Sequence, residues 1–233
     1  PCGTLFPYTT LFRSPAEGWK VLHFPLSMRA EGVTILDDWD SCGMRGTGSN
    51  TIDLDDVFVS EESISLERPA GRWHSVWSMI VGVAFPVFLA PYLGIAERSR
   101  DMAVAEGRDR WSRSSDPHQV QLLGELETQL MQARLAWQEM VRTANDYDFE
   151  VSVRNANHTL IQKTILVQAC IRTVEKAIES TGGKGFHRAF GLERLFRDVL
   201  AGTFHPLTPK KQEVFSGRLS LGLDPITGDR AEP

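Results

Sequence analysis

The chain has 233 residues, of which 42% are hydrophobic, and a formal net charge of -5, which suits one or two soluble domains with a real core. Its 25 Lys and Arg are scattered and are outnumbered by 30 Asp and Glu, which argues against a nucleic-acid partner. Cys2, Cys42 and Cys170 are odd in number and too far apart for metal-ligand spacing. We therefore expect no metal site and a reducing, cytoplasmic setting.

The first residues differ in kind from the rest. Thr4 to Ser14, TLFPYTTLFRS, matches residue for residue the translation of a widely used sequencing-adapter end. We interpret residues 1–14 as an artefact that packs against nothing specific, because such a segment was never selected to fit this protein. The stretch also lacks a basic start followed by an apolar run, so it does not predict a secretory signal.

Residues 15–67 have β character. The segments VLHFPL, GVTILDDW and NTIDLDDVFV predict short strands, with alternation clearest between Ile52 and Val59. Arg45 is either a cation that faces a substrate or a packing residue, and the sequence does not separate the two. Turns between the strands are expected at Gly43, Gly46 and Gly48.

A connector and the most apolar stretch of the chain follow. Glu61 to Arg72 predicts a connector, because a proline and a glycine interrupt it. Trp73 to Ala96 has roughly the length of a membrane span, but Pro86 and Pro91 break it and no basic cluster flanks one end. We therefore expect a buried helix that starts near one of these prolines, and no membrane partner.

Two later segments carry apolar side chains three and four residues apart, which is typical of helices in a shallow-angle antiparallel bundle. A polar turn is expected between them at 145–157. A last helix is expected from Pro209, capped by Thr208, to about Leu221, with a disordered tail over 225–233. The two seams are Leu123, Leu126, Leu130, Ala133, Trp137, Met140 and Ala144, then Leu160, Thr164, Val167, Ile171, Val174 and Ile178.

The segment 179–206 combines a glycine-rich turn, a basic helix and a histidine-proline corner. Gly182, Gly183 and Gly185 follow the second seam, so at least one should stop that helix in a left-handed conformation while the others admit a close ligand. A helix restarts after Gly191, and its first backbone N–H groups could bind an anion. From spacing alone, an ordinary helix-loop-helix corner is favoured over a phosphate site.

The same residues resemble a signature of the acyl-CoA dehydrogenase superfamily. Its Gly-Gly-x-Gly turn matches Gly182, Gly183 and Gly185, followed by Leu-Glu-Arg at 192–194 and Arg-Asp at 197–198. The resemblance implies a mainly α fold, an antiparallel four-helix-type bundle over 68–224 preceded by a partial middle β domain over 15–67. It also implies that the three glycines and Arg194 bind FAD, with FMN as the alternative.

The chain departs from the main branch of that superfamily at the position of the catalytic base. Acyl-CoA dehydrogenation needs a carboxylate that removes the α proton while the flavin takes a hydride. The resemblance places this glutamate soon after the Arg-Asp pair or on the first bundle helix, yet 199–212 and 71–95 contain no Asp or Glu. His205, held extended by Pro206, stands near the expected place. Its ordinary pKa of about 6.5 suits a proton donor or acceptor, although a histidine in a surface turn is the alternative.

A histidine here, with the Gly-Arg-Leu-x-Leu-Gly run at 217–222, resembles the flavin monooxygenases of the same fold. We therefore predict that His205 is the catalytic residue of an N-terminally truncated flavin-dependent oxidoreductase, which oxygenates a small organic substrate with reduced flavin and oxygen. The alternatives are FAD-dependent α,β-dehydrogenation of an acyl-CoA and a helical association module without enzymatic activity. Expected partners are further copies of the chain, in a homodimer or homotetramer, and a flavin reductase.

Two further departures concern flavin binding. The superfamily's N-terminal helical domain and the flavin loop of its β domain have no counterpart in this sequence. Residues 108–117, RDRWSRSSDP, match the family's Arg-x-x-Phe-Gly flavin segment only in part. We therefore expect the chain alone to be inactive and to bind flavin weakly.

Overall fold

The computed structural model describes residues 10–14 and 18–230, so the part of the predicted artefact at 1–9 lies outside it. The chain divides into two compact units. The first consists of Pro1–Ser41 and Arg45–His74, and the second of Cys42–Met44 and Ser75–Pro233. Three residues of the predicted β region thus belong to the second, helical unit.

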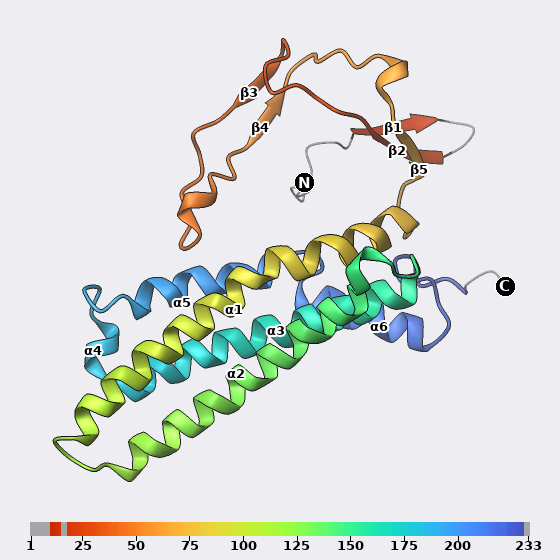
Figure 1. The fold of residues 1–233 in the computed structure, drawn as a ribbon. Coiled ribbons are helices and arrows are strands. Elements are labelled where there is room, and N and C mark those ends of the chain that lie inside the picture. Colours follow the sequence, from red (N-terminus) through yellow and green to blue (C-terminus); the bar gives the residue numbers. More distant parts are fainter. Residues whose placement is uncertain (1–9, 15–17, 231–233) are drawn as a thin grey trace. The chain divides into compact units, whose positions relative to one another are not determined.

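The first unit contains antiparallel strands and two turns of 3-10 helix (Figure 1). One sheet has the strand order β1-β2-β5, and β3 pairs with β4 in a second. Val21 and Phe24 are its buried apolar side chains among the described residues. The elements are β1 (Thr10–Ser14), β2 (Gly18–His23), β3 (Val33–Ile35), η1 (Arg45–Thr47), β4 (Ile52–Leu54), η2 (Glu61–Ser63) and β5 (Leu66–Pro69).

Two strands of this unit lie where the sequence predicted none. β1 falls within the predicted artefact, and its backbone pairs with β2 from Thr10 opposite Leu22 to Ser14 opposite Gly18. A strand edge can accept any extended segment, because the ladder uses only backbone groups. β5 lies inside the expected connector, and Pro69 is its last residue. At a strand end the missing N–H of proline costs little.

The second unit is an antiparallel bundle (Figure 1). Helices α1, α2 and α3 pack on one another, and the shorter α5 packs on α1 and α3. The predicted mainly α, four-helix-type bundle is confirmed, with α6 added against α3. The elements are α1 (Ser75–Trp111), α2 (Pro117–Ala144), η3 (Asn145–Tyr147), α3 (Val153–Thr181), α4 (Gly183–Phe186), α5 (Leu192–Leu200), η4 (Ala201–Phe204) and α6 (Pro209–Ser220).

Helix α1 begins earlier than predicted, at Ser75, and contains both Pro86 and Pro91. A proline inside a helix removes one backbone donor and crowds the carbonyl four residues before it. The helix continues because its apolar side chains are buried against α2 and α3, with Leu89 fully inaccessible. In addition, the indole N–H of Trp137 donates to the Pro86 carbonyl at 2.9 Å. Tertiary packing therefore outweighs the local preference to start at a proline.

By length and composition, α1 could also cross a membrane. Its most apolar window has a mean hydropathy of 2.0, and no other helix of the described residues meets this criterion. However, 44% of that window is buried inside the protein, and the core helix of a bundle satisfies the same test.

The two predicted seams are largely confirmed. In α2 the buried apolar positions are Leu122, Leu126, Leu130, Ala133, Ala136, Met140 and Ala144, so Leu122 takes the place predicted for Leu123. Trp137, Ile171 and Ile178 of the predicted seams are only half-buried. Helix α3 is buried on more than one face, because it packs against α1, α2 and α5. A single seam is too narrow for such a central helix, and Lys163, Leu166, Ala169, Cys170, Thr173 and Ala177 are buried beside Leu160, Thr164, Val167 and Val174.

Two helix starts differ in detail from the prediction. Helix α3 begins at Val153, inside the stretch expected to be a turn, because the Ser152 hydroxyl accepts from the Asn155 N–H at 3.2 Å and caps the helix. Helix α6 begins at Pro209 as predicted, but the Thr208 side chain makes no capping hydrogen bond.

The described part of the C-terminal tail forms a turn, where the sequence predicted disorder. Leu223 and Arg230 form an isolated antiparallel bridge. Between them, Asp224 Oδ1 accepts from the N–H groups of Ile226 and Thr227, both at 2.8 Å. A short side chain that satisfies its own following backbone is a common way to order such a turn.

Candidate functional site

His205 lies in an aromatic corner of the helical unit. It caps η4 with an extended backbone, at φ -62° and ψ 142°. Its ring centroid is 4.8 Å from that of Phe88 and 5.4 Å from that of Tyr92, both on α1. Tyr92 Oη and His205 Nε2 form a 2.7 Å hydrogen bond. The other ring nitrogen, Nδ1, has no hydrogen bond within the described chain, so it can engage a ligand.

The surroundings keep His205 neutral. Burial, and secondly the charge of Lys163, lower the pKa of His205 to about 4. Burial, followed by the charge of Asp198, raises the pKa of Tyr92 to about 12. The expectation that His205 titrates at its ordinary pKa is therefore wrong, because an imidazolium would lose its hydration here and face an ammonium. At neutral pH the site offers an uncharged imidazole that donates or accepts one hydrogen bond.

Sequence reasoning missed Lys163 of α3, which is fully buried. Its Nζ donates to the His205 carbonyl at 3.0 Å and to the Leu207 carbonyl at 2.5 Å. Burial lowers the pKa of Lys163 to about 8. A signal existed in the sequence, since Lys163 lies three residues after Leu160 and four before Val167, in the middle of an apolar seam. An ionisable side chain at such a position needs a partner.

The Arg-Asp pair of the signature anchors the segment Cys42–Met44. Asp198 Oδ1 accepts from the Met44 N–H at 2.7 Å, and Arg197 Nη1 donates to the Cys42 carbonyl at 2.8 Å. Met44 has a positive φ of 51°, a backbone conformation that residues other than glycine rarely adopt. The Arg-Asp pair of the signature and three residues of the predicted β region thus contact each other. The guanidinium of Arg45, the next residue, pairs at 3.1 Å with exposed Asp40.

Alanine at Gly43 is expected to loosen this anchor. A Cβ there would collide with the backbone carbonyl of Arg197, which cannot move without displacing α5. We expect a loss of about 1–3 kcal/mol in unfolding free energy, as for other overpacked sites. Thermal denaturation of Gly43→Ala measures it. Gly46→Ala is the matched control, because nothing lies within 4 Å of its Cβ position, and equal melting of the two variants would contradict the contact.

The glycine turn stops α3, as predicted, but in a different conformation. Gly182 has φ 58° and ψ -147°, which only glycine adopts readily, whereas the left-handed helical region was expected. A Cβ at Gly185 would overlap the Thr181 side chain, while one at Gly183 would meet nothing within 4 Å. Gly185 is therefore required by packing, and Gly183 is the position where a ligand could approach the backbone.

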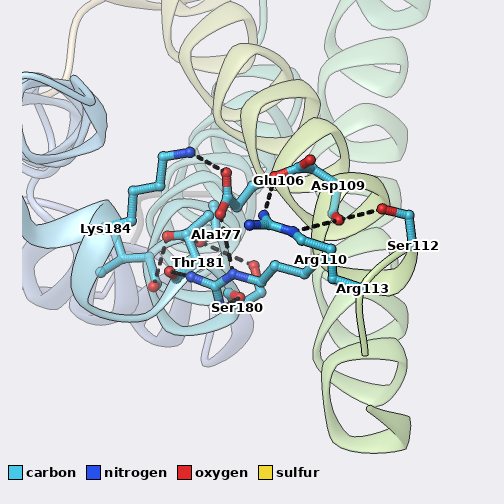
Figure 2. A network of polar contacts seen from close by, with 10 residues as sticks. Glu106, Asp109, Arg110, Ser112, Arg113, Ala177, Ser180, Thr181 and Lys184 are labelled. Atoms are coloured by element: carbon cyan, nitrogen blue, oxygen red, sulfur yellow. Dashed lines mark hydrogen bonds and ion pairs between the residues drawn. The ribbon is translucent and has the colours of Figure 1, made fainter. Parts of the chain in front are cut away.

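A polar network surrounds this turn (Figure 2). Glu106 of α1 is buried and accepts from Lys184 Nζ at 2.5 Å and from Arg110 Nε at 3.1 Å. The hydrogen bond from Lys184 is the main cause that lowers the pKa of Glu106. Arg110 also donates to the carbonyls of Ser180, at 3.4 Å, and Thr181. The cations nearest the glycines are thus engaged within the protein.

A cavity of about 580 Å³ opens at this end of the bundle, between the end of α1, the start of α2 and the end of α3. Its lining includes Arg110, Arg113, His118 and Glu179. Arg194, predicted to bind a cofactor together with the glycines, is not among the lining residues. It is exposed on α5 and makes no hydrogen bond or ion pair within the described part of the chain.

The structure does not bring the two predicted sites together. Helix α5, of nine residues, separates the glycine turn from η4 and His205. At about 1.5 Å per residue it is roughly 13 Å long. A single ligand that touched both would have to be long, and otherwise they serve different ligands.

Comparison with known proteins places this geometry in context. Residues 87–209, more than half of the chain, match the family described as "Acyl-CoA dehydrogenase, C-terminal domain". YdbM of Bacillus subtilis (strain 168), a provisionally assigned acyl-CoA dehydrogenase, is 30% identical over 184 residues, which cover 75% of this chain and 46% of YdbM. Dibenzothiophene monooxygenase of Mycolicibacterium goodii is 29% identical over 211 residues, which cover 79% of this chain and 49% of that enzyme.

The chain spans about half the length of the curated relatives it matches. Its fold is also that of a solved structure, KijD3 in complex with FMN and dTDP-3-amino-2,3,6-trideoxy-4-keto-3-methyl-D-glucose. The TM-score is 0.76 at 23% identity, and the match covers 92% of this chain and 54% of KijD3.

Proposed function

The chain belongs to the acyl-CoA dehydrogenase superfamily, and on that premise we propose that the whole protein is a flavin-dependent oxidoreductase that oxygenates a small organic substrate with reduced flavin and oxygen. The single observation that carries this proposal is the neutral His205 in its aromatic corner, with Nδ1 open to a ligand. The similarity to dibenzothiophene monooxygenase supports the same choice.

The residues of this corner fit an uncharged, planar, hydrogen-bonding ligand such as a flavin ring or an aromatic substrate. A reduced flavin, when bound, supplies the electrons that activate oxygen. The imidazole can hold a hydrogen bond at one ligand atom through Nδ1, and Phe88 supplies an apolar ring beside it. If the Tyr92 hydroxyl donates to Nε2, then Nδ1 carries the imidazole proton and donates toward the ligand.

Dehydrogenation of an acyl-CoA is the second candidate, favoured by the 30% identity to YdbM. That reaction needs a carboxylate close to the substrate. In the described chain, the acid closest to the corner in sequence is Asp198, and one of its oxygens already accepts from the Met44 backbone. This engagement is why oxygenation is preferred.

A two-armed experiment on the whole protein separates the candidates. In the first arm, chemically reduced FAD or FMN is mixed with the protein, dibenzothiophene as probe and oxygen, and oxygenated product is measured. In the second, the protein with oxidised flavin is kept anaerobic, and acyl-CoA thioesters are added while flavin absorbance is followed. Product that requires oxygen, without anaerobic bleaching, is the expected result. Bleaching by an acyl-CoA would establish dehydrogenation, and no reaction in either arm would favour an association module.

The 233-residue chain by itself is expected to retain no stoichiometric flavin. The described part of the chain offers one aromatic corner and one glycine turn, and the nearby cations Arg110 and Lys184 are already paired. Dialysis against FAD or FMN, followed by an absorbance spectrum, tests this. A bound flavin in one-to-one ratio with the chain would refute the expectation. Whether it was retained after dialysis against FAD or against FMN would identify the preferred flavin.

We further propose that the protein assembles with copies of itself, as a homodimer or homotetramer, and works in the cytoplasm with a separate flavin reductase. An oxygenase that consumes reduced flavin needs a continuous supply of it, which a reductase provides. Sedimentation of the whole protein gives its assembly state. Turnover sustained by a reductase and nicotinamide nucleotide, in place of chemical reductant, tests the second partner.

A further inference from the structure

The buried lysine behind the corner calls for a physical explanation. Lys163 is among the largest side chains that are fully buried in the described chain. Removing an ammonium group from water costs several kcal/mol unless hydrogen bonds compensate. A methionine would fill the same space in the seam of α3 without that cost. Filling the core therefore does not account for a lysine at this position.

What the ammonium group does is bind two backbone carbonyls. They belong to His205 and Leu207, on either side of Pro206, at 3.0 and 2.5 Å. The chain here has left η4 and has not yet entered α6, so these carbonyls have no helical partners. Proline supplies no backbone N–H. Lys163 thus satisfies the groups that a corner of this shape leaves unpaired.

The chain is also closely packed three residues before His205. A Cβ at Gly202 of η4 would lie 3.0 Å from the Val167 methyl groups and 3.3 Å from the Tyr92 ring. Hence η4 sits directly on α3 and α1, and the chain that leaves it has little freedom at its start. The two bonds from Lys163 fix it at its end.

We propose that Lys163 is a positioning residue that holds the His205 imidazole against Tyr92 for the chemistry of the site. It does so through the backbone, by fixing both carbonyls that flank Pro206. It contacts no ring atom that would react. The inference rests on the proposed function only for its effect on turnover, because the positioning itself can be measured without a flavin.

Lys163 also has an electrostatic effect on the imidazole. Its charge acts after burial as the second cause that lowers the pKa of His205. From α1 the imidazole faces neutral Tyr92, and from α5 the charge of Asp198 acts on Tyr92. No carboxylate of the described residues hydrogen-bonds the ring. Loss of the lysine charge should therefore raise the pKa of His205.

Nuclear magnetic resonance on the 233-residue chain tests both effects through the histidine ring signals. In Lys163→Met the bonds and the charge are both lost, so the ring signals should lose the shifts caused by Phe88 and Tyr92, and the pKa of His205 should rise by about half a unit to one unit. Lys163→Gln keeps N–H donors without charge, so the ring shifts should persist while the pKa rises. Lys176→Met is the control, since Lys176 lies on the same helix and pairs with Glu125 and Glu179.

A folded Lys163→Met chain with unchanged His205 ring shifts and pKa would overturn the proposal. If Lys163→Met does not fold, proton exchange in the parent chain provides the test instead. Its Lys163 ammonium protons must exchange with solvent more slowly than those of Lys176, and equal exchange would equally overturn it. In the whole protein, Lys163→Met is expected to lower kcat about tenfold or more with little change in KM. Altered ring signals with unaltered turnover would leave the positioning intact and would refute the role of His205 in the proposed function.

Discussion

Replacement of His205 by alanine is expected to slow turnover of the whole protein by on the order of a hundredfold or more. The variant loses the hydrogen bond that Nδ1 can make to a ligand and leaves the buried Tyr92 hydroxyl without its 2.7 Å partner. The fold should persist, because the corner is held by the Lys163 bonds to backbone carbonyls, which alanine retains.

The test compares His205→Ala with its parent in two measurements. These are the steady-state rate with reduced flavin and oxygen, and the thermal midpoint. His187→Ala is the control, since His187 is exposed at the end of α4 and should change neither quantity. A His205→Ala protein as active and as stable as its parent would make His205 a turn residue. Dehydrogenation would then become the preferred function.

The pH dependence follows from the lowered pKa of His205. With a folded pKa of about 4, the imidazole remains neutral at all pH values well above 4, so a rate that depends on it should be flat through about pH 6.5. Unfolded histidine binds its proton near about pH 6.5. Between these values the unfolded state binds more protons, so stability is lost as the pH falls from 6.5 toward 4. A rate that titrates near pH 6.5 would show that the imidazole is not buried as described.

Local patterns in the sequence predicted the bundle well, because seam spacing and glycine placement are properties of neighbouring residues. Leu126 and Leu130 are buried and Gly182 ends α3, as expected. The start of α1 was predicted wrongly, because it depends on contacts between residues far apart in the sequence. Pro86 is tolerated within the helix because packing and a hydrogen bond from Trp137, fifty-one residues later, support it.

The parts of the candidate site that the sequence did not predict depend on contacts between distant residues. The sequence pointed to His205, but its neutrality comes first from burial and second from the charge of Lys163, forty-two residues away. Its hydrogen bond joins it to Tyr92, which is 113 residues away. The contact of Arg197 with Cys42 spans 155 residues. A lysine inside an apolar seam was the one local sign of this arrangement. Its partners are backbone carbonyls, which no residue pattern records.

Removal of Arg110 is expected to have the largest effect on the glycine turn. Its guanidinium hydrogen-bonds the carbonyls of Ser180 and Thr181 at the end of α3, and it pairs with buried Glu106 (Figure 2). Arg110→Ala returns the carbonyls to water and leaves Glu106 with Lys184 alone. Hydrogen bonds to charged groups contribute about 1.5–3 kcal/mol each at most sites. We expect a total loss of about 2–3 kcal/mol, because Arg110 is partly exposed and solvent replaces some of its bonds.

Arg113→Ala is the matched control for this change. Arg113 lies just past the same end of α1, but it is exposed and, among the described residues, its side chain bonds only to Asp109, so its loss should cost no more than about 0.5 kcal/mol. Urea unfolding of both variants measures the difference. The difference in unfolding free energy between the parent and Arg110→Ala should shrink in acid. The pKa of Glu106 is lowered in the folded state, and the Arg110–Glu106 ion pair breaks as the pH falls through that pKa. If Arg110→Ala were no less stable than Arg113→Ala at neutral pH, the network would be a surface feature, and the glycine turn would be held by its own backbone.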